Sequence, residues 1–403
     1  MSSSLFAEIP LAAKDPILGV TEQFAADPRP GKANLGVGVY NDEHGKLPLL
    51  ESVVKAEAVL NAEHAARGYL PIDGMQAYNK AVQTLLFGAD SPLLASGRVI
   101  TTQALGGTGA LKLGADLVHW FAPGRKVLIS NPSWENHRAL FEAAGLAVHQ
   151  YPYYHAPTRG LDFDGMLGAL EAAEPGSVIV LHACCHNPTG VDLTDPQWDR
   201  VIEVLERKQH LPFLDIAYQG FAEGIEQDAS AVRKFAAGKL PFLVSSSFSK
   251  SFSLYGERVG ALSVVLADKD EAQRVLSQLK RVIRTNYSNP PTHGGAIVTR
   301  ILSDPALRAQ WEGELGAMRE RIRAMRAGLV ERLKAAGAKI DADYIVRQRG
   351  MFSYTGLTPA QVDRLRTDHA IYAVASGRIC IAALNPGNLD RVAKAIAAVL
   401  DQG

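Results

Sequence analysis

Apolar runs that end in small or polar residues alternate with amphipathic segments along most of the chain. The strand-like runs cover residues 126–130, 178–183, 213–215, 242–246 and 261–266. Strands that alternate with helices are typical of an α/β fold, in which a mostly parallel sheet is covered by helices on both faces. Several runs lead directly into polar residues, and ligands of open α/β sheets bind at the carboxyl ends of the strands. The pattern therefore predicts one shared site at this edge of the sheet.

A long amphipathic helix is predicted after the pair Asp304-Pro305. Its apolar positions step by three or four residues from Leu307 to Leu333, with Asp304 expected as the N-cap and Pro305 at the first helical position. The helix is expected to end near Gly337, and its length suggests that it connects two structural units.

The residues beyond this helix predict a smaller α+β unit. Two strand-like pieces cover residues 350–354 and 379–382, and the apolar stripe from Leu389 to Leu400 indicates a final helix. The first 14 residues show no clear period, so they are either a flexible arm or a segment exchanged with another subunit.

The chain has 403 residues and the composition of an ordinary globular protein. It carries 42 basic and 42 acidic side chains. This balance gives no overall field that would attract nucleic acid or an anionic membrane. No stretch approaches the roughly 18 apolar residues of a membrane span, and no secretory signal is evident. Three cysteines are too few for a disulfide framework. We therefore expect a cytoplasmic protein.

Lys250 is the most informative residue of the segment Ser-Ser-Ser-Phe-Ser-Lys-Ser-Phe-Ser-Leu-Tyr-Gly-Glu-Arg at 245–258. A lysine at a strand end can form a Schiff base when desolvation and nearby positive charge lower its pKa. The hydroxyl groups and Arg258 could hold a phosphate. Taken alone, the segment fits a serine-rich loop with a surface lysine better than it fits a catalytic lysine. The other motifs reverse this preference.

Asp215 ends the very apolar segment Phe213-Leu214-Asp215. A buried acid is seldom left unpaired, because its desolvation costs several kcal/mol. Asp215 should therefore face a cation or a protonated nitrogen, such as that of a pyridine ring. An N-cap or a structural ion pair is the alternative interpretation.

The segment His-Ala-Cys-Cys-His-Asn-Pro-Thr-Gly at 182–190 follows another apolar run. Its Asn-Pro-Thr-Gly turn fixes the side chain of Asn187, whose amide can donate to a phenolate oxygen. The segment also contains four possible zinc ligands, but they are crowded into five residues of extended chain without CxxC spacing. We therefore expect no metal; the four residues are His182, Cys184, Cys185 and His186.

A glycine-rich turn that includes Gly107 and Thr108 enters a helix, and its free N–H groups would form an anion site. The turn does not match the dinucleotide fingerprint, because Lys112 stands where the third glycine would be. No Walker A loop occurs in the chain, so the phosphate belongs to neither a nucleoside triphosphate nor NAD. Trp134 follows another strand-like run, and its flat ring could stack on a planar cofactor or belong to the core.

Together these motifs resemble those of the class I pyridoxal-phosphate aminotransferases, in particular the bacterial aspartate and aromatic-amino-acid enzymes. The resemblance runs from about Asp15 to the C-terminus. It rests on Asn-Leu-Gly-Val-Gly-Val-Tyr at 34–40, Cys-His-Asn-Pro-Thr-Gly at 185–190, Ser-Phe-Ser-Lys at 247–250 and Ala-Ser-Gly-Arg at 375–378. It implies pyridoxal 5'-phosphate as the cofactor and the α/β fold of fold-type I transferases, with a mostly parallel central sheet flanked by helices and a smaller α+β domain.

The resemblance also implies a role for each cofactor-binding residue. Lys250 would carry the cofactor and shuttle a proton at the substrate Cα, and Asp215 would pair with the pyridinium nitrogen. Asn187 and Tyr218 would face the phenolic oxygen, and Trp134 would stack on the ring. The expected phosphate ligands are Gly107, Thr108, Ser247, Ser249 and Arg258, with Tyr69 contributed by the neighbouring subunit; His137 and His182 would stand behind the cofactor-binding residues.

Substrate recognition is expected from two arginines. Arg378 would bind the α-carboxylate through its planar fork, and Arg284 would reach across a dimer to the distal carboxylate of a dicarboxylate. Several segments look closer to the aromatic-amino-acid enzymes, whereas Asn289 follows the aspartate enzymes. The substrate-binding residues that the resemblance implies are Gly38, Tyr69, Trp134, Asn187, Arg284 and Arg378.

The domain organisation implied by the resemblance is an N-terminal arm at 1–14, a large cofactor domain at 45–318, and a small domain made from 15–44 and 319–403. Because Tyr69 and Arg284 would enter the other active site, we expect a homodimer with shared sites and no nucleic-acid or membrane partner.

The resulting hypothesis is ping-pong transamination between tyrosine, phenylalanine or aspartate and 2-oxoglutarate. Three alternatives are kept: an aspartate aminotransferase with little aromatic activity, a pyridoxal-phosphate decarboxylase or lyase, and a ligand-sensing module without catalysis. The last is disfavoured because about 14 residues before the fold leave no room for a helix-turn-helix.

Overall fold

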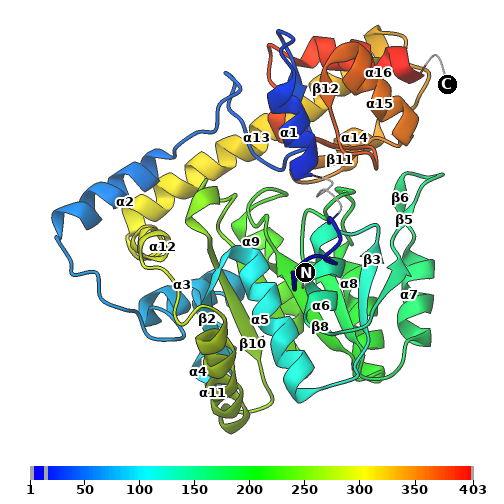
Figure 1. The fold of residues 1–403 in the computed structure, drawn as a ribbon. Coiled ribbons are helices and arrows are strands. Elements are labelled where there is room, and N and C mark those ends of the chain that lie inside the picture. The colour runs from blue at the N-terminus through cyan, green and yellow to red at the C-terminus, as the bar shows by residue number, and fades with distance from the viewer. Residues whose placement is uncertain (1–3, 13–16, 401–403) are drawn as a thin grey trace.

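The computed structural model describes residues 4–12 and 17–400, and Figure 1 shows a large lower body joined to a smaller upper unit. The large body contains a seven-stranded sheet in the order β2-β10-β9-β8-β7-β3-β4. The strands of this sheet are β2 (Val99–Leu105), β3 (Val127–Asn131), β4 (Val148–Pro152), β7 (Val178–His182), β8 (Leu211–Ile216), β9 (Phe242–Ser247) and β10 (Val259–Val265).

Strand β10 runs antiparallel to both of its neighbours, whereas the pairings from β9 through to β4 are parallel. The five strand-like runs found in the sequence all correspond to strands of this sheet, which confirms the expected mostly parallel α/β architecture.

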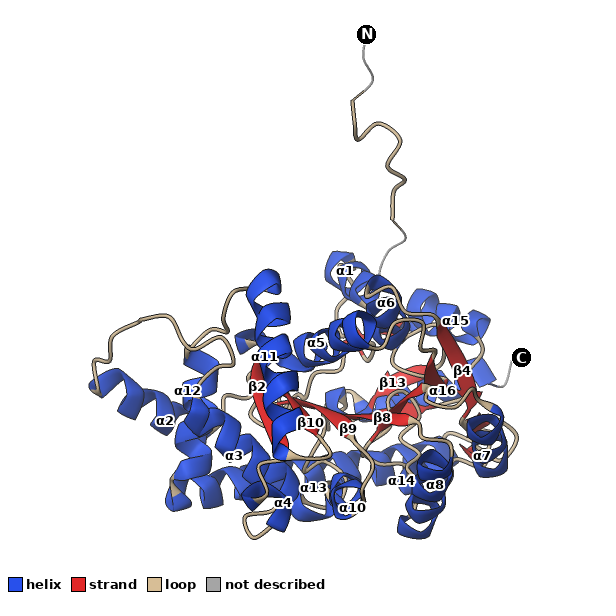
Figure 2. Cartoon of the chain, turned by 90° about the horizontal axis from the view of Figure 1, so that it is seen from below, coloured by secondary structure: helices blue, strands red, loops and turns tan. Residues whose placement is uncertain are grey.

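Helices cover both faces of the sheet, as Figure 2 shows. Successive side chains along each strand point alternately into two hydrophobic cores, one on each face of the sheet. Phe213 therefore belongs to one core and its neighbour Leu214 to the other. This alternation explains why the central strands are apolar at nearly every position. The helices of the large body are α2 (Glu51–Ala62), α3 (Gln76–Phe87), α4 (Pro92–Ala95), α5 (Gly106–Phe121), α6 (Glu135–Ala143), α7 (Phe163–Ala172), α8 (Asp195–Arg207), α9 (Ile225–Asp228), α10 (Ser230–Ala237), α11 (Lys269–Asn286) and α12 (His293–Ser303).

The long helix α13 (Pro305–Ala335) leads from the large body into the smaller unit (Figure 1). Asp304 is its N-cap and accepts the N–H groups of Ala306 and Leu307, as the sequence predicts. Trp311 of this helix donates to the Ser251 carbonyl of the large body at 2.7 Å. Farther along, α13 packs against α16 (Leu389–Leu400), so that it contacts both units.

The smaller unit joins segments from both ends of the chain. Strand β1 (Ala33–Asn34) pairs in parallel with β12 (Ile371–Tyr372), and β11 (Phe352–Tyr354) pairs antiparallel with β13 (Arg378–Cys380). The remaining elements are α1 (Leu18–Ala26), α14 (Tyr344–Arg347), α15 (Pro359–His369) and a 3₁₀ turn at Ile381–Ala383; a small hairpin of β5 (Tyr154–His155) and β6 (Gly160–Leu161) belongs to the large body.

Within residues 4–12 several large apolar side chains are exposed; they are Leu5, Phe6, Ile9 and Leu11. Residues 1–3, 13 and 14 of the expected arm, and residues 15 and 16 of the expected small domain, lie outside the described residues, as do residues 401–403. Across the part of the chain that the structure describes, no helix combines the length and apolar character needed to cross a bilayer.

Candidate active site

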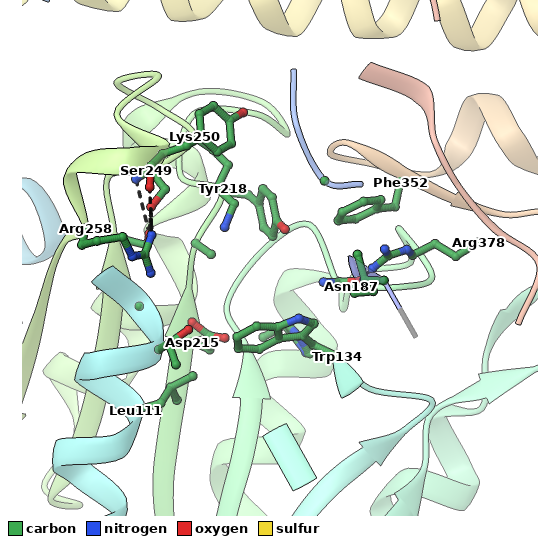
Figure 3. A pocket seen from close by; sticks show the side chains of 18 residues that line it. Leu111, Trp134, Asn187, Asp215, Tyr218, Ser249, Lys250, Arg258, Phe352 and Arg378 are labelled. Carbon is green, nitrogen blue, oxygen red and sulfur yellow. Dashed lines mark hydrogen bonds between the residues drawn. The ribbon is translucent and has the colours of Figure 1, made fainter. Parts of the chain in front are cut away.

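A cavity of about 260 Å³ lies at the carboxyl ends of the parallel strands, between the large body and the smaller unit. Its wall combines loops of the large body with residues of β11 and β13 (Figure 3). Thirteen residues singled out in the sequence line it: Gly38, Gly107, Thr108, Trp134, His182, Asn187, Asp215, Tyr218, Ser247, Ser249, Lys250, Arg258 and Arg378.

Lys250 follows β9 and points its Nζ into this cavity beside Tyr218 (Figure 3). The Nζ atom lies 5.1 Å from the centroid of the Tyr218 ring. Desolvation lowers the pKa of Lys250 to about 8, against the opposing effect of the Asp215 charge. Roughly a tenth of the lysine is therefore a neutral, nucleophilic amine at pH 7, and this fraction rises to about half near pH 8.

Asp215 is buried at the end of β8 and is held by a histidine. His137 Nε2 donates to Asp215 Oδ2 at 3.0 Å, and the Ser133 hydroxyl lies 2.9 Å from His137 Nδ1. Burial alone raises the pKa of Asp215, but the His137 hydrogen bond and nearby positive charge leave that pKa below its ordinary value. Asp215 is thus kept as a buried anion that can face a positively charged nitrogen.

An anion-binding cradle forms where β9 and α5 meet. Leu105 is the N-cap of α5, and among the described residues no side-chain capping bond is made there, so the N–H groups of the first turn are available to an anion. Arg258 Nη1 lies 3.4 Å from Ser249 Oγ, and Ser247 Oγ lies 3.2 Å from the same hydroxyl (Figure 3).

Two glycines of the cradle have close neighbours, and Gly106 has a φ of +69° that favours glycine. A Cβ on Gly106 would lie 2.5 Å from the guanidinium of Arg258, and one on Gly107 would lie 3.2 Å from Ser247 Cβ. Glycines therefore let the backbone come close to the hydroxyl and guanidinium groups that surround an anion.

Arg378 is buried on the opposite side of the cavity. Its Nη1 donates to Asn187 Oδ1 at 3.0 Å and its Nη2 to the Gly36 carbonyl at 2.6 Å. The Phe352 ring covers the guanidinium, with 4.3 Å between Arg378 Cζ and the ring centroid. This fixed cation is suited to a carboxylate.

Comparison with known proteins decides the family. The family model described as "Aminotransferase class I and II" matches residues 30–396. The chain belongs to this family. It is 62% identical to aspartate aminotransferase of Pseudomonas aeruginosa over 98% of this chain and 100% of that one. It is 52% identical to aromatic-amino-acid aminotransferase of Escherichia coli over the same shares.

The structure of aromatic-amino-acid aminotransferase from Burkholderia pseudomallei, covalently bound to pyridoxal phosphate, superposes with a TM-score of 0.97. That protein is 66% identical, and the match covers 99% of this chain and 100% of that one. The likeness confirms the family resemblance and the fold expected from the sequence.

Two residues expected in the aminotransferase site lie outside the cavity of this chain. Tyr69 is 95% exposed. Arg284 is exposed at the end of α11 and bonds Ser288 Oγ of its own chain. Neither lines the cavity, so this chain by itself brings together the expected site residues apart from these two.

The four residues considered as zinc ligands do not lie in one cluster of possible ligands. His182 belongs to one cluster of possible ligands, and Cys184 and Cys185 belong to another. His186 bonds the Ser130 hydroxyl at 2.9 Å instead. These four side chains therefore do not converge on one centre.

Several residues that line the cavity were not predicted from the sequence. Phe352 packs on Arg378, and the Tyr255 hydroxyl accepts the Tyr40 N–H at 2.9 Å. Ile17 also lines the cavity. The Tyr255 position was visible in the 247–258 segment, whereas Ile17 and Phe352 have apolar side chains with no chemical signature in a single sequence.

Proposed function

We propose that this aminotransferase uses pyridoxal 5'-phosphate to transfer the amino group of aromatic amino acids and of aspartate to 2-oxoglutarate. The observation that carries the proposal is one cavity in which Lys250, the Asp215–His137 pair and an anion cradle all meet. Relatives at 50 to 66% identity that are named as aromatic-amino-acid, tyrosine and aspartate aminotransferases support both substrate classes.

The residues present fit the cofactor. Gly107, where a Cβ would lie a tight 3.2 Å from Ser247 Cβ, keeps the first turn of α5 open toward Ser247, as a phosphate site requires. Thr108, Ser249 and Arg258 would complete the phosphate ligands. Asp215 would hold a protonated ring nitrogen by charge, and this preference for a cation agrees with its lowered pKa.

Three further residues would surround the planar part of the cofactor. Trp134, next to His137, presents an indole ring to the cavity, and Asn187 and Tyr218 present an amide and a hydroxyl. Burial raises the pKa of Tyr218, so its hydroxyl stays protonated at neutral pH and can donate a hydrogen bond. When bound, pyridoxal phosphate supplies an aldehyde and an electron-withdrawing ring that stabilises negative charge at a substrate Cα.

The chain's own groups then orient the substrate and move its proton. Arg378 would bind the α-carboxylate, with Asn187 and Gly36 fixing its fork. Lys250 Nζ, neutral in part near pH 8, would carry the proton from the substrate Cα to the cofactor in the first half-reaction and back to Cα in the second. Because Arg378 holds the carboxylate in place, the geometry favours proton transfer over loss of carbon dioxide.

We also infer a homodimer in which each subunit completes its partner's site. Exposed Tyr69 and Arg284 would contribute the remaining phosphate and distal-carboxylate contacts. The exposed apolar side chains of residues 4–12 support an arm that packs on a second copy.

We infer a large domain at 45–318 and a small domain at 15–44 and 319–403, which the pairing of β1 with β12 supports. Three free, buried cysteines support a reducing, cytoplasmic setting.

A single-turnover experiment tests the proposed function. Cofactor-loaded enzyme is mixed with tyrosine, phenylalanine or aspartate in the absence of an oxo acid, and the products are quantified. Transamination predicts one equivalent of the matching oxo acid per site, with further turnover only after 2-oxoglutarate is added. Release of carbon dioxide or pyruvate without an acceptor would instead show a decarboxylase or lyase. Turnover of aspartate alone would identify an aspartate aminotransferase with little aromatic activity.

A further inference from the structure

Arg326 is a buried cation outside the cavity that the proposed reaction does not use. It lies on α13 and is 2% exposed. Desolvation lowers its pKa to about 10, so the guanidinium remains charged at neutral pH. An apolar residue would occupy this position without the cost of burying a charge. We therefore attribute the presence of Arg326 to the geometry that its hydrogen bonds impose on neighbouring backbone groups.

The hydrogen bonds of Arg326 within the described residues all go to backbone carbonyls. Nη1 donates to Ile345 at 3.1 Å, and Nη2 donates to Gly350 at 2.7 Å and to Phe352 at 2.5 Å. The guanidinium fork thereby fixes the direction of two carbonyls that flank Met351 in the segment leading into β11.

The same segment is fixed against the loop that carries Asn187. A Cβ on Gly350, whose φ is +77°, would lie 2.5 Å from Cys185 Cβ. The Arg349 N–H donates to the Gly190 carbonyl at 2.7 Å. The backbone bound by Arg326 thus packs closely against one wall of the cavity. This backbone has little space in which to move.

Phe352 belongs to this segment, and its side chain faces the cavity (Figure 3). Its ring centroid lies 4.3 Å from Arg378 Cζ and 6.0 Å from the centroid of Tyr218. On the other side, a Cβ on Gly38 would lie 2.7 Å from Phe352 Cζ. The ring is therefore confined between the carboxylate-binding arginine, a tyrosine and a glycine that leaves just enough space.

We propose that Arg326 is a positioning residue for substrate carboxylate recognition, because its bonds to the Gly350 and Phe352 carbonyls hold the Phe352 ring against Arg378. The inference rests on the proposed function in that it assigns Arg378 to the α-carboxylate. Arg326 touches neither substrate nor cofactor in this scheme and acts through Phe352.

The test compares Arg326→Lys and Arg326→Gln with the control Arg332→Lys. Lysine keeps the charge at 326 but cannot reproduce the fork, whereas Arg332, on the same helix, is 40% exposed and bonds the carbonyl of Gly328. For both variants at 326 we expect the KM for amino acids and the Kd of succinate to rise about tenfold, the cost of one misaligned charge-assisted contact. The kcat and the absorbance spectrum of the bound cofactor should change little, and the control should match wild type.

A double-mutant cycle with Phe352→Leu shows whether Arg326 acts through the ring. We expect Arg326→Lys to add less than about twofold to the Kd of succinate once Phe352 is replaced, because the two changes disturb one contact.

An unchanged KM and Kd, or additive effects in the cycle, would overturn the inference. So would failure of both Arg326 variants to fold while Phe352→Leu folds, since Arg326 would then serve stability alone. A wild-type enzyme that binds succinate but does not transaminate would contradict the proposed function separately.

Discussion

Lys250 is expected to lower the folding stability of the cofactor-free enzyme. Its pKa falls from an ordinary 10.5 to about 8 because desolvation disfavours the charged amine. At about 1.4 kcal/mol for each pH unit between the two values, burying the charge costs about 3 kcal/mol of folding free energy. The side chain is only partly buried, so solvent screening reduces this cost to about 1 to 3 kcal/mol. Lys250→Met should therefore raise the stability of the cofactor-free chain at pH 7 while abolishing turnover.

The sign follows from the protonation of the two states. The folded-state pKa lies below the unfolded value, so the penalty is complete below about pH 8. As the pH rises from about 8 to 10.5, the folded state loses its proton first and the penalty disappears. The stability advantage of Lys250→Met should thus shrink across this interval.

Urea unfolding of the cofactor-free proteins at pH 7 and at pH 9.5, in phosphate-free buffer and at equal protein concentration, measures this advantage. Lys239→Met is the matched control, because Lys239 is exposed and its replacement should change stability by less than about 0.5 kcal/mol. A Lys250→Met chain that is no more stable than wild type, or an advantage that does not depend on pH, would refute the reasoning.

Three other changes test the remaining parts of the site. Asp215→Asn removes the buried anion and should lower kcat by about 10²- to 10³-fold in steady-state assays; near-normal kcat would remove Asp215 from the mechanism. Arg258→Gln removes the cation of the cradle, and equilibrium dialysis should show a Kd for pyridoxal phosphate raised about 10- to 100-fold; unchanged affinity would place the phosphate elsewhere. Dissociating and mixing inactive Lys250→Met dimers with Arg284→Gln dimers should restore about a quarter of wild-type aspartate activity, because half of the dimers then contain one intact site. No gain over Arg284→Gln alone would show that Arg284 does not act across the interface.

Much of the site was predictable because several of its polar and charged residues stand directly beside runs of apolar residues in the sequence. Asp215 ends a strand of otherwise apolar residues, and Lys250 follows one, so both stand out in the sequence alone. Asp304 and Pro305 likewise indicated the start of α13, since an N-cap and a proline at the first turn have local physical causes.

Other features depend on contacts between residues far apart in the chain. Phe352 belongs to the site because β11 pairs with β13 and places its ring over Arg378. Arg326 stands on the buried side of α13, where a periodicity argument expects an apolar residue. Nothing local in the sequence reveals the three carbonyls that Arg326 meets.

The central claim is that Lys250 is the residue that holds pyridoxal phosphate. The most direct measurement is borohydride reduction of the purified, cofactor-loaded enzyme, followed by peptide mass spectrometry. The account predicts one pyridoxyl group per subunit, on the peptide that contains Lys250, and its loss when excess aspartate or tyrosine is added before reduction. A label on another lysine, or none on a chain that still transaminates, would contradict the account.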